Sequence, residues 1–88
     1  MDNKIIGTSI DEYVTGYQGD DTIYGKSGGG TLDGFWGNDL ILGGAGNDSI
    51  MGGSGSDAIH GEYGDDYLHG GDGDNTIIGG NGDDTIFF

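Results

Sequence analysis

The chain has 88 residues, room for one domain, and includes 23 glycines, no proline, no cysteine and a formal net charge of −14. This charge excludes nucleic acid and anionic membrane surfaces as partners, because both attract basic side chains, and it favours cations. Without cysteine, a domain this small must be stapled by a metal or by assembly rather than by disulfides.

Residues 7–87 divide into nine consecutive nonapeptides without insertion. In order they read GTSIDEYVT, GYQGDDTIY, GKSGGGTLD, GFWGNDLIL, GGAGNDSIM, GGSGSDAIH, GEYGDDYLH, GGDGDNTII and GGNGDDTIF. The first position is always glycine, the fourth is glycine except at Ile10, and the eighth is always aliphatic. Residues 1–6 fit a capping half-repeat, because Ile5 is in phase with the aliphatic positions.

Each nonapeptide predicts one short strand and one turn. The last three positions are rich in Thr, Ile, Leu and Tyr, which favour strands, and the eighth side chain should point inward. The predicted strands are 13–15, 22–24, 31–33, 40–42, 49–51, 58–60, 67–69, 76–78 and 85–87. The other six positions are rich in glycine, which permits a positive φ and lets carbonyl oxygens converge.

The sixth position carries the acidic residues that recur with this period. It is aspartate in six repeats, at Asp21, Asp39, Asp48, Asp57, Asp66 and Asp84. A solvated acidic surface is the usual interpretation of such charge, but it does not explain an aspartate at every ninth residue beside glycine. Carboxylate and carbonyl oxygens are what calcium coordinates. The fifth-position acids, Asp11, Asp20, Asp65, Asp74 and Asp83, are interpreted as loop-surface residues that attract cations.

The pattern resembles the G-G-x-G-x-D-x-U-x repeat of RTX (repeats-in-toxin) proteins over residues 7–87. The resemblance implies an all-β fold, a right-handed parallel β-roll (a β-solenoid) with two short-stranded parallel sheets and two nonapeptides per turn. Residues 1–88 would form this single domain. Calcium would lie between stacked loops on both flanks, with each sixth-position aspartate bridging two ions.

The same resemblance implies the ligands. It pairs Asp21 with Asp39, Asp39 with Asp57, Asp48 with Asp66, and Asp66 with Asp84, and it adds a weaker site between Asp57 and Asn75. Gly30 removes a ligand and Glu12 is longer, so about five ions are expected, within a range of about four to six. The implied metal ligands are Asp21, Asp39, Asp48, Asp57, Asp66, Asp84 and Asn75, with carbonyl groups of Gly16, Gly34, Gly43, Gly44, Gly46, Gly52, Gly53, Gly55, Gly61, Gly64, Gly70, Gly71, Gly73, Gly79, Gly80 and Gly82.

These features predict a calcium-binding folding module of a secreted bacterial protein, unfolded without calcium because its aliphatic core is small. No catalytic constellation is present, and His60 and His69 have no partner for a transition-metal site, so we do not expect an enzyme. A polysaccharide-binding accessory module of a secreted carbohydrate-active enzyme is an alternative. An ice-binding β-roll is another, although the threonines divide between the two sheets.

Two apolar regions remain as candidate contact surfaces. Tyr17, Phe35 and Trp36 should be neighbours on one flank and could form a patch for a ligand. Self-association, or contact with a domain of a parent protein, is expected through Tyr24, Leu40, Leu42, Phe87 and Phe88, since exposed strand edges and apolar patches recruit other chains.

Overall fold

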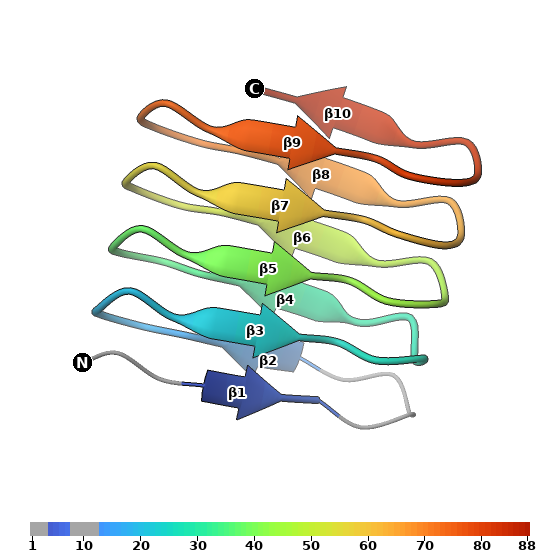
Figure 1. The fold of residues 1–88 in the computed structure, drawn as a ribbon, viewed down its shortest axis with the longest axis horizontal. Coiled ribbons are helices and arrows are strands. Elements are labelled where there is room, and N and C mark those ends of the chain that lie inside the picture. Colours follow the sequence, from blue (N-terminus) through green and yellow to red (C-terminus); the bar gives the residue numbers. More distant parts are fainter. Residues whose placement is uncertain (1–3, 8–12) are drawn as a thin grey trace.

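The computed structural model describes residues 4–7 and 13–88, which form ten strands of three residues each (Figure 1). The strands are β1 (Lys4–Ile6), β2 (Tyr13–Thr15), β3 (Thr22–Tyr24), β4 (Thr31–Asp33), β5 (Leu40–Leu42), β6 (Ser49–Met51), β7 (Ala58–His60), β8 (Tyr67–His69), β9 (Thr76–Ile78) and β10 (Thr85–Phe87). Nine of them lie where the repeat predicts a strand. The expectations for Ile10, Asp11 and Glu12 fall outside the described residues.

The strands alternate between two parallel sheets, which confirms the predicted β-roll. The first sheet has the order β1-β3-β5-β7-β9, and the second has the order β10-β8-β6-β4-β2. Each strand pairs with the strand two repeats away, as Ile23 does with Ile41 and Ile50 with Leu68. Two nonapeptides therefore make one coil, and residues 18 positions apart stack on each other.

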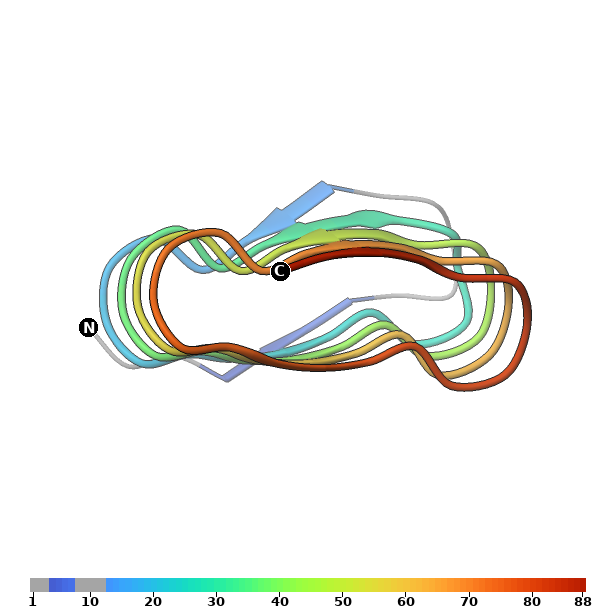
Figure 2. The same ribbon diagram turned by 90° about the horizontal axis from the view of Figure 1, so that it is seen from above.

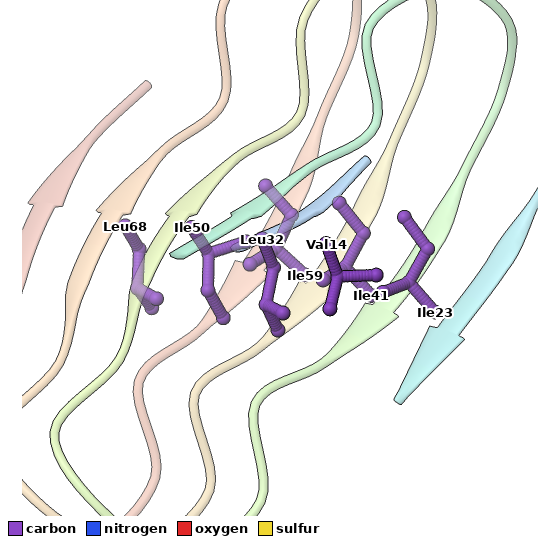
Figure 3. Close-up of a cluster of buried hydrophobic side chains, with 7 residues drawn as sticks. All are labelled: Val14, Ile23, Leu32, Ile41, Ile50, Ile59 and Leu68. Carbon is purple, nitrogen blue, oxygen red and sulfur yellow. The ribbon is translucent and has the colours of Figure 1, made fainter. Parts of the chain in front are cut away.

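The core is a single layer of aliphatic side chains between the sheets (Figure 3). The eighth-position residues point inward because side chains alternate along a strand. Seven of them are buried: Val14, Ile23, Leu32, Ile41, Ile50, Ile59 and Leu68. Ile5, Ile77 and Ile86 are partly buried and pack against this layer. Such a thin core gives the fold little apolar burial relative to the backbone that it orders.

Seen along the stack, the roll has two facing layers joined by loops at both ends (Figure 2). We call the loops before β3, β5, β7 and β9 the first flank, and those before β4, β6, β8 and β10 the second flank. Hydrogen bonds between coils continue from the strands into these loops, as from Gly34 N to Met51 O at 2.9 Å. No helix capable of crossing a membrane occurs within the described ranges.

Candidate metal centre

Each loop turns through backbone conformations that favour glycine. The fourth position has a φ of 93° to 105° in every described repeat except the third. At Gly55 a Cβ atom would also collide with the carbonyl oxygen of Gly37 in the preceding coil. Glycine therefore allows both the turn and the close stacking of the loops. The second position has a positive φ even where it is not glycine, as at Tyr17 and Phe35.

The sixth-position side chains form a hydrogen-bonded column along each flank, which we call the inner ladder. In each case Oδ1 accepts the backbone N–H of the sixth-position residue one coil earlier, at 2.8 to 2.9 Å. The acceptors are Asp39, Asp57 and Asn75 on the first flank, and Asp48, Asp66 and Asp84 on the second. The structure thus brings the predicted aspartates into two regular columns.

The second carboxylate oxygen, Oδ2, of the six sixth-position aspartates lies on the side of the loop carbonyl groups. Oδ2 is buried in five of them, and in Asp39, Asp57 and Asp66 it has no hydrogen-bond partner. A Cβ atom built on Gly61 would lie 2.6 Å from Asp66 Oδ2 and 2.7 Å from the carbonyl oxygen of Gly79. Oxygens from two successive coils therefore converge beside the first-position glycine. The same arrangement occurs three more times, pairing Asp39 with Gly52, Asp48 with Gly61, and Asp57 with Gly70.

This arrangement suits a hard cation. A buried carboxylate oxygen without a donor is costly unless a positive charge accompanies it. Calcium accepts carboxylate and carbonyl oxygens together in flexible geometry. Within the described ranges, no three His, Cys, Asp or Glu side chains group closely enough to hold a metal ion. An ion at the inner ladder must therefore take most of its ligands from the backbone.

A family model for the RTX calcium-binding nonapeptide repeat matches residues 2–32, 33–62 and 60–88. The chain belongs to this family. RTX repeats bind calcium, form a structural rather than catalytic module, and are typical of secreted bacterial proteins. No curated protein matches the chain.

Among the loops that the structure describes, those of two RTX repeats depart from the common arrangement. In the third, Gly30 has no side chain, and a Cβ atom built on Gly25 would meet the Gly43 carbonyl oxygen and a methyl group of Leu32 rather than a carboxylate. In the eighth, Asn75 uses Oδ1 for the inner ladder, so its Nδ2 faces Gly70 and donates to the Gly71 carbonyl oxygen at 3.3 Å. The amide therefore presents a donor where the other repeats present an oxygen.

Burial shifts the titration of the inner ladder. The pKa of Asp39 is raised from 3.8 to about 7, mainly by burial and to a smaller extent by the nearby Asp57 and Asp21 carboxylates. Burial likewise raises the pKa of Asp57 and of Asp66 to about 6. In each case the backbone N–H bond acts in the opposite direction. Without a metal, ionisation of these groups opposes the folded RTX roll.

The fifth-position side chains form a second column, which the sequence analysis missed. Asp20 Oδ1 accepts the backbone N–H of Asn38, and Asp65 Oδ1 accepts that of Asp83, at 2.8 and 2.7 Å. Asn38 and Asn47 do the same for the next loops on their flanks. This outer ladder reaches toward the following coil, whereas the inner ladder reaches toward the preceding one. Asp, Asn or Ser at eight of the nine fifth positions was the available signal.

The aromatic residues predicted to be neighbours do meet on the first flank. The rings of Tyr17 and Phe35 are 5.6 Å apart, and those of Phe35 and Trp36 are 5.8 Å apart, both edge to face. His60 and His69 lie on opposite sheets of the RTX roll.

The apolar residues expected to mediate association lie on two different surfaces. Tyr24, Leu40 and Leu42 are on the first sheet, where Tyr24 and Leu40 are exposed. Phe87 is on the second sheet, and its ring lies 5.4 Å from that of Tyr67. Phe88 is 81% exposed.

Proposed function

We propose that this RTX chain is a calcium-dependent folding module of a secreted bacterial protein, without catalytic activity of its own. The observation that carries the proposal is the set of buried Oδ2 atoms that face carbonyl oxygens of the next coil, with no donor near those of Asp39, Asp57 and Asp66. A chain with 16 acidic and two basic residues has few cations of its own to place there. Calcium would supply that charge.

The proposed ligands are the six sixth-position aspartates together with glycine carbonyls of the stacked loops. Five aspartates have a buried Oδ2: Asp21, Asp39, Asp48, Asp57 and Asp66. Each of them has the loop of a later coil stacked on it, which supports about five ions, one for each interval between loops. Asn75 would be the weakest side-chain ligand, because its oxygen must leave the bond from Asp57 N to turn toward an ion.

Calcium should be required for folding as well as bound. Seven buried aliphatic side chains must offset the ordering of a glycine-rich backbone and the repulsion of stacked carboxylates. Where calcium is scarce the chain would stay unfolded, and in a calcium-rich extracellular medium it would fold. This behaviour would suit a protein that crosses membranes before folding.

Circular dichroism and titration calorimetry on one sample test the proposal. In chelator we expect a largely unfolded spectrum, and on adding calcium a β spectrum that saturates at about five ions per chain. Magnesium should not substitute, because it resists dehydration and prefers a tighter octahedral shell. A full β spectrum with cooperative melting in chelator would contradict the proposal.

A further inference from the structure

A groove of about 400 Å³ runs along the roll where the second sheet meets the first flank. Its floor is formed by Asp33, Met51 and His69, which are in register on β4, β6 and β8. Neighbouring strands are about 4.8 Å apart, so the floor spans about 10 Å. Phe35 and Trp36 form the wall at the Asp33 end.

The groove exists because successive loops carry different residues at the second position. In the second and fourth repeats Tyr17 and Phe35 place rings there, whereas the sixth and eighth have Gly53 and Gly71, which leave the space open. At the third position Trp36 is replaced by Ser54 in the next loop of this flank. The result is a channel that is closed by aromatic rings at one end and lined by small residues along its side.

The charge in the groove favours a cationic occupant. Asp33 is only 7% exposed, and its Oδ1 accepts the N–H of Phe35 at 3.1 Å, which fixes the carboxylate beside the aromatic wall. Asp72 adds a second carboxylate, and no lysine or arginine lines the groove. The sequence has no arginine, and its two lysines belong to other elements, Lys26 to the second flank and Lys4 to β1 of the first sheet.

We propose that this groove binds an arginine side chain presented by a partner protein. The guanidinium group would pair with the Asp33 carboxylate and stack on Trp36, while the apolar stem would lie over Met51. A planar guanidinium group satisfies both contacts at once, because its forked donors match a carboxylate and its face stacks on indole. A lysine ammonium group offers neither the plane nor the fork. This inference requires the folded roll but no particular number of calcium ions.

The test uses Trp36, the only tryptophan, as a fluorescent reporter in the calcium-loaded chain. The probe is the peptide Gly-Gly-Arg-Gly-Gly, and the control peptide replaces arginine by citrulline, which has nearly the same shape without the charge. We expect saturable binding of the arginine peptide with a dissociation constant on the order of 1 mM. The citrulline peptide and methyl glucoside should not bind. Binding of either, or a response that does not saturate, would overturn the proposal.

Variants locate the binding. Asp33→Asn should weaken it by at least about tenfold, whereas Asp74→Asn, which removes the same charge from an exposed loop position, should not. Ser54→Tyr fills the groove at a position where Trp36 and Tyr63 already show that large side chains fit. It keeps the net charge and Trp36 as the only tryptophan, so loss of binding there would separate the groove from general attraction to a polyanion.

Dichroism in calcium reports folding for every variant, so failure of the roll to fold is distinguished from failure of the groove. If Asp33→Asn does not fold, Ser54→Tyr decides. Unchanged binding by a folded Ser54→Tyr variant would refute the proposed location. Binding of butylguanidine with no binding of the peptide would show a small-cation site rather than a docking site, and would also refute it.

Discussion

Replacing Asp66 by asparagine separates its role as a metal ligand from its role in the inner ladder. Asp66 Oδ1 accepts the N–H of Asp48, and its Oδ2 faces the carbonyl oxygen of Gly79. Asparagine can keep the first contact and replaces the second oxygen with a donor, as Asn75 does in the eighth repeat. Asp66→Asn should therefore lose the metal ligand Oδ2, and with it calcium binding beside Asp66, while the loop keeps its hydrogen bond.

The cost follows from linkage between binding and folding. At a calcium concentration of 100 times the dissociation constant, each lost site removes about 2.7 kcal/mol from the free energy of unfolding. Asp66→Ala removes the same sites and also leaves the buried Asp48 N–H without its acceptor, at a further cost of about 1–3 kcal/mol. In the metal-free state at neutral pH, Asp66→Asn should have a higher free energy of unfolding than the parent chain. The reason is that it removes a buried carboxylate whose pKa is raised to about 6.

Metal analysis and calorimetry count the ions, and chemical denaturation in saturating calcium measures stability. Asp65→Asn is the matched control, because it removes the same charge one residue away, and Asn38 and Asn47 already fill the outer ladder at equivalent positions. We expect Asp65→Asn to bind as many ions as the parent chain. If Asp66→Asn also binds the full number, Oδ2 is not a ligand and the reasoning from its burial is wrong.

Four further outcomes are expected. Asp66→Ala should reduce the calcium stoichiometry by two and Asp21→Ala by one, because Asp66 lies in the middle of its column; equal losses would contradict bridging. The metal-free chain should contain more β structure at pH 4 than at pH 7.5 by dichroism. The pKa values of Asp39, Asp57 and Asp66 are raised from 3.8 to about 6 or 7 in the folded roll, so their contribution to stability is present below pH 4 and is lost as pH rises through these values. Gly55→Ala, at a φ of 105°, should lower the free energy of unfolding in calcium by at least about 2 kcal/mol, and an unchanged denaturation midpoint would refute the close approach of the coils. Calcium should promote self-association of the parent chain, measured by light scattering. The double variant Phe87→Lys with Phe88→Lys should associate less while binding as much calcium. A calcium-loaded parent chain that stays monomeric at high concentration would exclude Phe87 and Phe88 as a contact surface.

The sequence predicted the features that depend on the repeat alone. A period of nine with one aliphatic position predicted the strands and the inward layer, because side chains alternate along a strand. The two columns of aspartate were implied by the resemblance to the RTX repeat, in which two nonapeptides make one turn. Gly30 takes part in the inner ladder only through its backbone N–H, which donates to Asp48 Oδ1, and the expected loss of a calcium ligand there stays a prediction.

Other features depend on contacts between coils, which no local pattern encodes. The sequence could not show that Asn75 directs its amide nitrogen toward Gly70. This orientation is set by the N–H of Asp57, which donates to Asn75 Oδ1 and so leaves Nδ2 on the side of Gly70. The outer ladder was missed because an exposed Asp65 looks like a solvated acid until Asp83 N is placed 2.7 Å from its oxygen. The groove was missed because it combines a strand floor with loop residues of three different repeats.

The uniform offset of 18 residues determines how such a chain can change in length. Because every repeat stacks on the one two places away, removing a single nonapeptide exchanges the flanks downstream of the cut but leaves all downstream partners together. Only the junction changes: without residues 25–33, Asp21 would stack beneath Asp48, and the column interrupted by Gly30 would become continuous. Duplication or loss of one repeat is therefore tolerated by the geometry, whereas insertion of one residue would misalign the core. The roll can lengthen in steps of nine, and each step adds a place for a cation.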